Sequence, residues 1–279
     1  MTFINDQERV PFKFTPIGRL VEFARLVYVV TVNKTRAGSA NALAALLKRI
    51  LLMVVVIAGF FALMQVTGLR GMTGRTQFIL FIAVGVFVFF VHVGAIRSSM
   101  GAGDANNPMT LHAPVTPLLE IFGTALSQLY INVLTISIIA LIIHIFVSPI
   151  AIDDPKALAA AFFWAWLCGL AIGTTIAGIG SFIPLFKSLA PRLVMRVNMI
   201  FGGKMIAANQ LPSALLPFFL WNPLFHIIDH ARAATFNNYT VRVTNMEYAM
   251  WVTFTFFALG LMLMHASKKI VNPSWAARR

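Results

Sequence analysis

Cysteine and acidic residues are scarce in this chain of 279 residues. Cys168 is the only cysteine, so an intrachain disulfide and a metal cluster built from several cysteines are both excluded. Asp and Glu together number nine and are scattered along the sequence. Their one adjacent pair, Asp153 and Asp154, is expected to form a solvated turn before a helix.

Motifs that bind nucleotides or support hydrolysis are also missing. The stretch GAGD at 101–104 is not followed by Lys and Ser or Thr and does not leave a strand, so it is no phosphate-binding loop. The sequence contains no Gly-x-Ser-x-Gly element, and it shows no basic and aromatic platform of the kind that nucleic acid requires. We therefore expect no cofactor in this chain, no enzymatic activity and no nucleic-acid partner.

Charged residues make up only 11% of the sequence, whereas hydrophobic residues make up 59% and the mean hydropathy is +0.82. A soluble domain of similar length has about a quarter charged residues. The apolar residues form blocks of roughly 20, which is long enough to cross a hydrocarbon core of about 30 Å as a helix. Because backbone polar groups in lipid must be satisfied within a segment, the composition predicts an all-α polytopic membrane protein.

Six blocks are predicted to span the membrane: 50–69, 77–96, 118–146, 157–183, 193–208 and 248–265. An even number places both termini on the same side. Of the 22 Lys and Arg residues, sixteen then fall on the side of the termini and six on the other. The positive-inside rule therefore predicts cytoplasmic tails at 1–48 and 267–279 around a membrane domain at 49–266, and this bias explains most of the net charge of +13.

The N-terminal tail is predicted to contain an interfacial helix and no cleavable signal peptide. Thr15 is the expected N-cap and Pro16 the first helical residue. Apolar side chains then recur at helical spacing up to Thr31, while Arg19 and Arg25 take the opposite face. This pattern indicates a helix that lies in the membrane surface with its apolar side in lipid. A soluble amphipathic helix is the alternative.

Small and polar residues inside the predicted spans indicate contacts between helices. Gly169 and Gly173 lie four residues apart on one face of the fourth span, where their size lets another backbone approach. Packing within the bundle is favoured over a dimer contact. The third span holds four polar residues that should face protein or water and not lipid: Glu120, Gln128, Asn132 and His144.

Residues 211–232, LPSALLPFFLWNPLFHIIDHAR, are as apolar as a span but contain three prolines. Pro212, Pro217 and Pro223 each remove a backbone donor and restrict the preceding residue, so a single straight helix is excluded. Two short helices that enter the membrane and turn back fit better. We expect a re-entrant hairpin over 209–233 that lines a vestibule on the outer side. A broken element of this kind favours transport over a structural anchor.

The end of this segment carries polar groups that suit a membrane–water boundary. His226, Asp229 and His230 share one helical turn with Arg232 close by, and two His residues four apart can hold zinc. A third ligand is not evident, with Glu247 as the one candidate. We therefore expect no metal here, and a membrane-embedded metalloenzyme remains the remote alternative.

Two motifs carry a family resemblance. NPLFHIIDHAR at 222–232 resembles the Asn-Pro-x-x-His-x-Ile-acidic-x-x-Arg element of the permease subunits of polysaccharide-exporting ABC transporters. AGDANNPMTLHAPVTPLLEIFGTAL resembles the Ala-x-Asp-x-Asn and Pro-Val-x-Pro loop of capsular polysaccharide export permeases. Its matching positions are Ala102, Asp104, Asn106, Pro114, Val115 and Pro117. Leu119 and Thr124 replace an Asp and an Arg that are frequent in the family, so an ion pair there is absent or made through Glu120.

The resemblance implies a homodimeric permease of the bacterial inner membrane, joined to two separate ATPase subunits that hold ATP and Mg²⁺. It implies a lipid-linked polysaccharide as substrate, with membrane lipids and periplasmic and outer-membrane export proteins as further partners. The loop 97–117 would dock on the ATPase, with a short coupling helix near 104–111, through Arg97, Asp104, Asn106, Asn107, Pro114 and Pro117. The exit region would comprise Pro212, Pro217, Asn222, Pro223, His226, Asp229 and Arg232.

Aromatic rings can stack on sugars, and a cation can attract acidic sugar units. The candidate channel-lining residues are Phe60, Phe61, Phe87, Phe90 and Lys204, although an aromatic ring in a span more often faces core or lipid. Lys204 in the short fifth span is expected to meet water or a partner, because a lone lysine in lipid is costly. Export of O-antigen, of teichoic acid or of a small hydrophobic compound is the alternative within transport.

Overall fold

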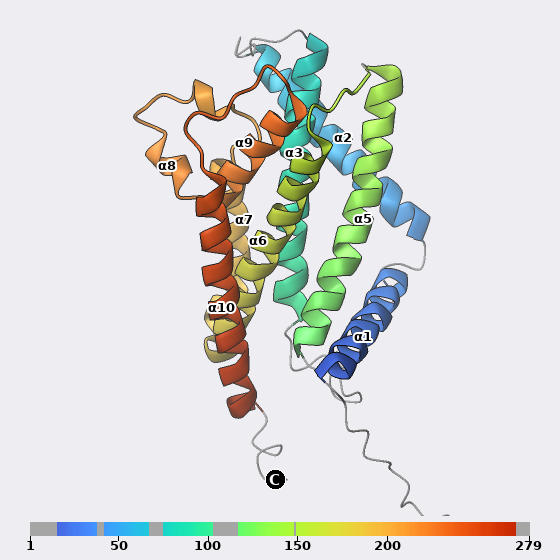
Figure 1. Cartoon of the computed structure of the whole chain (residues 1–279), viewed down its shortest axis with the longest axis vertical. Helices are drawn as coiled ribbons and strands as arrows, with labels where there is room; N and C mark the ends of the chain where they lie inside the picture. Colours follow the sequence, from blue (N-terminus) through green and yellow to red (C-terminus); the bar gives the residue numbers. More distant parts are fainter. Residues whose placement is uncertain (1–15, 38–41, 67–74, 103–116, 148, 272–279) are drawn as a thin grey trace, which may run out of the picture.

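The computed structural model describes residues 16–37, 42–66, 75–102, 117–147 and 149–271. Within these ranges the chain is a helical bundle without a strand, so the predicted all-α fold is confirmed there (Figure 1). The elements are α1 (Pro16–Ala37), α2 (Ala42–Val66), α3 (Arg75–Ala102), α5 (Pro117–Phe146), α6 (Pro155–Phe182), α7 (Pro184–Phe201), η1 (Ala208–Gln210), α8 (Pro217–Leu220), α9 (Pro223–Thr235) and α10 (Met246–Val271).

Five helices of the described chain are long and apolar enough to cross a membrane: α2, α3, α5, α6 and α10. They correspond to the predicted spans one to four and six. In Figure 1, α9 lies near the upper end of the bundle, whereas α1 and the end of α10 lie near the lower end. The length and number of these helices confirm a multi-pass membrane protein.

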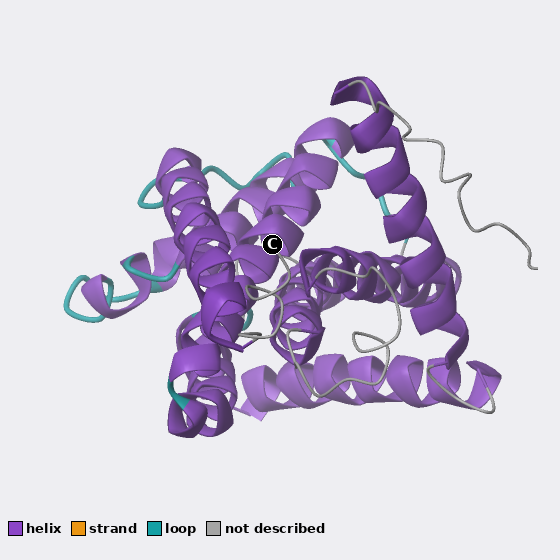
Figure 2. Cartoon of the chain, turned by 90° about the horizontal axis from the view of Figure 1, so that it is seen from below, coloured by secondary structure: helices purple, strands orange, loops and turns teal. Residues whose placement is uncertain are grey.

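The central helix of the bundle is α3, which packs against α2, α5, α6 and α9. Val88 and Val91 are completely buried, as is Ala95 one turn further on. A helix that is apolar on all sides is typical of a position enclosed by other helices. In the view from below in Figure 2, the described chain is almost entirely helical, with loops that join the ends of helices.

The contact between α3 and α6 depends on glycine. A Cβ atom on Gly169 would lie 2.3 Å from the carbonyl oxygen of His92, and one on Gly173 would lie 2.7 Å from that of Ile96. Only glycine therefore lets the two backbones approach so closely. The prediction that these glycines serve packing within the bundle is confirmed.

The N-terminal helix α1 packs along the first half of α5. Lys34 Nζ lies 2.8 Å from Glu120 Oε1, so Glu120 does form an ion pair, with a partner on another helix. Val27 is buried in the contact with its neighbours, whereas Tyr28 is exposed. The apolar side chains of α1 are thus partly buried against other helices and partly exposed to the surroundings of the protein. Thr15, the expected N-cap, lies outside the described residues.

The fifth predicted span, 193–208, has the wrong bounds. A single residue, Ile183, separates α6 from α7, which begins at Pro184 and ends at Phe201. Arg192 and Arg196 lie inside α7, and this helix is not among the five that are apolar enough to span. The prediction followed apolarity alone, whereas a helix can run through arginine because arginine is a good helix former.

The predicted break in 211–232 is confirmed. The chain passes through η1 and a series of turns into the four-residue helix α8 and then into α9. Pro217 and Pro223 each stand in the first turn of a helix, where their missing N–H has no partner to lose. The two helices differ in burial, because α8 has no buried residue whereas α9 packs against α3, α6 and α10.

Candidate functional site

All seven predicted exit residues lie in the connection between α7 and α10, residues 202–245, called here the α7–α10 connection. Asn222 is the N-cap of α9, and its Oδ1 accepts a hydrogen bond of 3.0 Å from the backbone N–H of Leu224. Its Nδ2 donates to Asn198 Oδ1 on α7 over 3.3 Å. Asn222 therefore both starts α9 and ties that start to the end of α7.

Arg232, near the end of α9, is 1% exposed and binds three backbone carbonyls. Its Nη1 donates to the carbonyl oxygens of Gly203 and Ile206, both at 3.0 Å, and its Nη2 donates to that of Lys204 at 2.7 Å. The planar guanidinium presents several donors in a fixed geometry that suits such a set of acceptors. Arg232 thus holds the turn that follows α7 against α9.

Glycine and an aromatic ring complete this arrangement. Gly203 has a φ of +69°, a left-handed conformation that favours glycine. Gly85 on α3 faces the same turn, where a Cβ atom would lie 2.7 Å from the carbonyl oxygen of Lys204 and 2.6 Å from Arg232 Nη2. The Phe81 ring stacks on the guanidinium, with 3.9 Å between Cζ and the ring centroid.

Lys204 lies beyond the end of α7 and is enclosed by protein, so its predicted place within a span is wrong. The side chain is 3% exposed, and its Nζ lies 3.9 Å from the ring centroid of Phe89 and 5.5 Å from that of Phe60. It also donates to the carbonyl oxygen of Met199 at 3.0 Å. Burial lowers the pKa of Lys204 to about 8 and that of Arg232 to about 10, so both are charged near neutral pH.

Asp229 attaches the loop after α9 to the helix itself. It is 1% exposed, and its carboxylate accepts hydrogen bonds from the hydroxyl of Tyr239 and, at 2.7 Å, from that of Thr244. Burial and the neighbouring carboxylate raise the pKa of Tyr239, so the phenol stays a donor. The Tyr239 ring also contacts Phe81, with 5.8 Å between the centroids.

His226 makes a second attachment. Its Nδ1 accepts from the backbone N–H of Asn245 at 2.9 Å, which fixes the tautomer so that Nε2 donates to the carbonyl oxygen of Leu220 at 2.7 Å. Burial lowers the pKa of His226, opposed in part by the hydrogen bond with the carbonyl oxygen of Leu220 and by Asp229. A neutral imidazole therefore joins α9 to the residue just before α10.

These contacts disfavour the metalloenzyme reading. Both ring nitrogens of His226 are engaged by backbone groups, and Asp229 is engaged by two hydroxyls. Within the described ranges, no group of three His, Cys, Asp or Glu side chains could hold a metal ion. A zinc ion between His226 and His230 would have to break the attachments of the loop.

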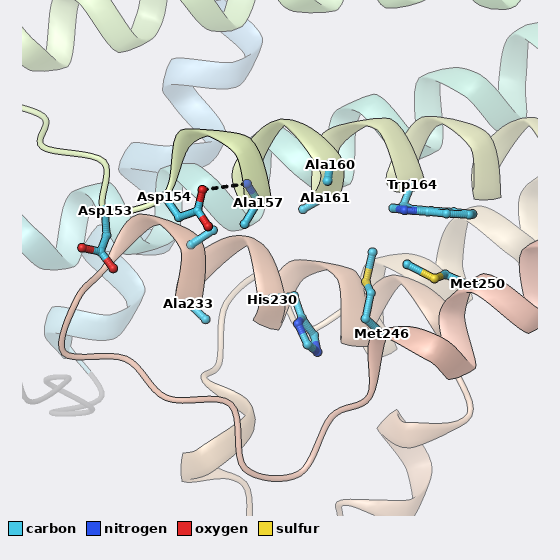
Figure 3. Close-up of a pocket in the computed structure, with 11 residues that line it drawn as sticks. Asp153, Asp154, Ala157, Ala160, Ala161, Trp164, His230, Ala233, Met246 and Met250 are labelled. Carbon is cyan, nitrogen blue, oxygen red and sulfur yellow. Dashed lines mark hydrogen bonds between the residues drawn. The ribbon is translucent and has the colours of Figure 1, made fainter.

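His230 lines a cavity of about 400 Å³ between α6, α9 and α10 (Figure 3). Trp164 from α6 and Met246 and Met250 from α10 supply apolar lining, while Asp153 and Asp154 lie at the beginning of α6. Asp154 is the N-cap of α6 and accepts from the N–H groups of the first turn, so its carboxylate has a structural task. The cavity thus combines apolar lining with the His230 imidazole and two carboxylates at one end.

The predicted coupling residues are only partly described. Arg97 is exposed and lies within α3, which continues to Ala102, so the connection starts later than the expected 97. Pro117 is the first residue of α5. Asp104, Asn106, Asn107 and Pro114 lie outside the described residues.

The candidate channel residues do not form one surface in the single chain. Phe87 is 4% exposed and belongs to a core of apolar side chains, which leaves it no accessible face. Phe60, Phe61 and Phe90 are half-buried against the same core. Among the predicted exit residues, Pro212 and Pro217 are exposed, whereas the other five are buried and act through their neighbours.

Several residues of this arrangement were missed from the sequence. Phe81 and Gly85 lie one turn apart on α3, and Tyr239 follows α9 by four residues. A single phenylalanine or glycine in an apolar span carries no distinctive signal. Asn198 was also missed, although an amide inside a short helix is the kind of group that needs a partner in lipid.

No protein-family model matches the sequence. The chain is similar to two Escherichia coli proteins, both described as "Polysialic acid transport protein KpsM", with 24% identity to each over 198 residues. The similar region covers 71% of this chain and 76% of each relative. This similarity confirms the resemblance to permeases of polysaccharide-exporting ABC transporters that the two sequence motifs indicate.

Proposed function

We propose that this chain is the permease subunit of an ATP-driven exporter that moves a lipid-linked capsular polysaccharide from the cytoplasm to the periplasm. ATP would be hydrolysed by a separate partner subunit. The similarity to polysialic acid transport proteins over 71% of the chain carries this proposal. The five apolar helices and the broken connection at one end of the bundle support it, because transport needs a membrane domain with an element that can move.

The proposed topology has six spans with both termini in the cytoplasm. The fifth span would be α7, whose 18 residues reach about 27 Å. α1 would be the interfacial helix on the cytoplasmic side, and the segment 209–233 would be the re-entrant hairpin on the periplasmic side. The excess of Lys and Arg on the side of the termini supports this orientation.

Transport would require two copies of the chain and two ATPase subunits. The candidate channel rings Phe60, Phe61 and Phe90 could then meet the polymer where two copies adjoin, since they are half-buried in one copy. The loop 97–117 would transmit movement of the ATPase to α3 and α5, whose adjacent ends it joins. A rigid-body tilt of packed helices is the kind of change such a connection can cause.

Deletion of the gene in a strain that makes an acidic surface polymer tests the export role. We expect the polymer to disappear from the surface and to accumulate inside the cell, and a plasmid copy should restore the surface polymer. Loss of polymer from both places would contradict export and indicate synthesis. Normal surface polymer would contradict the proposal entirely.

The substitution Asp104→Lys tests the docking role of the loop. It should reduce the ATPase activity stimulated by the permease by about tenfold, since a reversed charge at a contact costs on the order of 1.4 kcal/mol or more. The amount of protein in the membrane should stay unchanged. Asp153→Lys, at the opposite end of the bundle, is the matched control, and equal ATPase activities of both variants would contradict docking at Asp104.

A further inference from the structure

A cluster of two arginines and two amides joins α2, α3 and α5, away from the α7–α10 connection. Arg49 on α2 donates through Nη2 to Gln128 Oε1 at 3.1 Å and lies 3.5 Å through Nη1 from Asn132 Oδ1. Gln128 Nε2 lies 3.4 Å from the same Asn132 oxygen. Asn132 is in turn tied to α3 through the carbonyl oxygen of Phe90, at 3.4 Å. The amides thus hold the guanidinium in a defined orientation.

The cluster is positively charged, and no counterion for it is found among the residues that the structure describes. Arg97 follows Gly94 by three residues on α3, so it lies on the helix face that adjoins Asn132 and Gln128. The ion pair of the described chain is Lys34–Glu120, so that carboxylate serves another cation, and no acidic group of the described residues lies within ion-pair distance of Arg49 or Arg97. Two cations that face neutral amides create a local demand for an anion.

Glycine keeps the cluster compact. A Cβ atom on Gly94 would lie 2.8 Å from Asn132 Nδ2 and 3.1 Å from Gln128 Nε2. The guanidinium of Arg49 has five N–H groups, of which the amides engage those on Nη1 and Nη2 from one side. Donors therefore remain for an anion that approaches from outside the bundle.

Both arginines lie toward the lower ends of their helices in Figure 1, Arg49 seven residues after the start of α2 and Arg97 five residues before the end of α3. They fall near the margins of the windows that could span a membrane, 46–63 on α2 and 78–101 on α3. A long arginine side chain near a helix end can extend its guanidinium toward the membrane–water boundary. The two cations are therefore placed where they can reach lipid phosphates.

The surroundings of the cluster suit an acyl chain. Leu52, one turn after Arg49 on α2, is 53% exposed, and Val133, next to Asn132 on α5, is also exposed. Apolar exposed side chains therefore adjoin the charged groups on the side of the hydrocarbon core. A ligand with an anionic head and an apolar tail would satisfy both parts.

We propose that Arg49, Arg97, Gln128 and Asn132 form a binding site for the phosphodiester group of an anionic membrane lipid. Arg49 and Arg97 would share the phosphate oxygens, while the amides orient Arg49. The site rests on the proposed orientation in one respect, because that orientation places it in the cytoplasmic leaflet. There it would anchor α2 beside α3 and α5 at a fixed lipid.

Binding of phosphatidylglycerol to the purified full-length protein tests the site. The protein is placed in phosphatidylcholine nanodiscs doped with phosphatidylglycerol, and bound lipid is measured by native mass spectrometry. We expect Arg49→Gln to weaken retention of phosphatidylglycerol about tenfold, because a charge-assisted contact is lost. Arg49→Lys should weaken it nearly as much, because lysine keeps the charge but loses the forked geometry.

Two further variants keep the result interpretable. Lys48→Gln removes the same charge from an adjacent exposed residue and should have the smaller effect. Arg97→Gln tests the site without touching the amides, which protects the test if Arg49 variants fold poorly. Equal retention by Arg49→Lys and wild type, or equal losses in Lys48→Gln and Arg49→Gln, would overturn the site. This assay measures lipid retention and does not depend on export. Failure of the lipid site can therefore be told apart from failure of the proposed export function.

Discussion

Arg232 shows how one buried cation can organise irregular backbone. Its partners are three carbonyl oxygens and the face of Phe81, and no acidic group of the described chain forms an ion pair with it. The carbonyls of the turn after α7 would otherwise be buried without these donors, which costs free energy. Arg232 satisfies them and at the same time fixes the position of that turn against α9.

Replacement of Arg232 by lysine should therefore destabilise the protein although the charge is kept. A single ammonium cannot reach carbonyl oxygens on three residues in the geometry of the fork, so we expect a loss of about 2 kcal/mol. The measurement is thermal unfolding of the purified protein in detergent. Arg242→Lys, at an exposed position of the same connection, is the matched control. Equal melting temperatures for the two variants would show that the carbonyl contacts do not matter.

His226 makes the loop before α10 sensitive to pH. Burial lowers the pKa of His226 below its usual value of about 6.5, so the unfolded or detached state binds the proton first as the pH falls. The contact to Asn245 is thus fully present above about pH 6.5 and is lost progressively below it. Protonation of Nδ1 removes the acceptor of the Asn245 N–H.

Hydrogen exchange of the Asn245 amide measures this effect directly. After correction for the intrinsic rate, exchange should be faster at pH 5.5 than at pH 7.5. In His226→Phe the amide should exchange quickly at both values, because the acceptor is absent. An amide in wild type that is equally protected at both pH values would contradict a titrating His226.

The polar residues of this site could be predicted from the sequence, but their partners could not. His226, Asp229 and Arg232 stand out in an apolar segment, and all three proved to be buried groups with specific hydrogen bonds. Backbone carbonyls have no sequence signature, and Arg232 finds them 26 to 29 residues earlier in the chain. A boundary role was expected, whereas the structure gives these side chains the task of fixing backbone.

At the level of elements, close helix contacts depend on a few glycines. Gly169 and Gly173 could be recognised from their spacing on α6. Gly85 could not, because its neighbour is the turn at 203–206 and not another helix with a matching pattern. Its role becomes visible only when α3 and the α7–α10 connection are seen together.

Gly85→Ala should separate that turn from α3. The added Cβ would meet the backbone of Lys204, which cannot yield as a flexible side chain would, so we expect a loss of about 1–3 kcal/mol. Gly59→Ala is the control, since nothing lies within 4 Å of its Cβ position and alanine is the better helix former. Thermal unfolding of both variants distinguishes the two cases, and an unchanged melting temperature for Gly85→Ala would disprove the tight contact.

Element type was easier to predict than element bounds. Five long apolar blocks became helices because nothing in them opposes that outcome, and the prolines of 211–232 broke the segment as expected. The fifth block failed because apolarity and helicity diverge there: α7 includes Arg192 and Arg196 in its interior and ends at Phe201, so residues 202–208 do not continue it. Gly202 and Gly203 explain the early end, since glycine is a poor helix former.

On the scale of the whole molecule, the proposed topology can be tested with one cysteine. Ser213→Cys lies at an exposed position of the α7–α10 connection, and the native Cys168 is buried. A membrane-impermeant maleimide applied to cells with a permeable outer membrane should label Ser213→Cys but neither wild type nor Ser274→Cys. Labelling of Ser274→Cys alone would reverse the orientation of the chain.

Composition predicted the class of the molecule, because 59% hydrophobic residues arranged in long blocks are typical of membrane-spanning helices and not of a soluble domain. It could not predict the packing order in which α3 is central, since most of the blocks are similarly apolar. The similarity to polysialic acid transport proteins adds a direction for function that no single side chain supplies. Contacts between two copies of the chain depend on surfaces that a single copy leaves exposed.

The reliance of Arg232 on carbonyl oxygens has an environmental consequence under the proposed orientation. A bacterial periplasm takes on much of the acidity and salinity of the surrounding medium. Amide oxygens neither gain protons in mild acid nor exchange counterions in brine. The hydrogen bonds of Arg232 would therefore persist under conditions that weaken an ion pair between arginine and a carboxylate. Only alkali strong enough to discharge the guanidinium would break these hydrogen bonds.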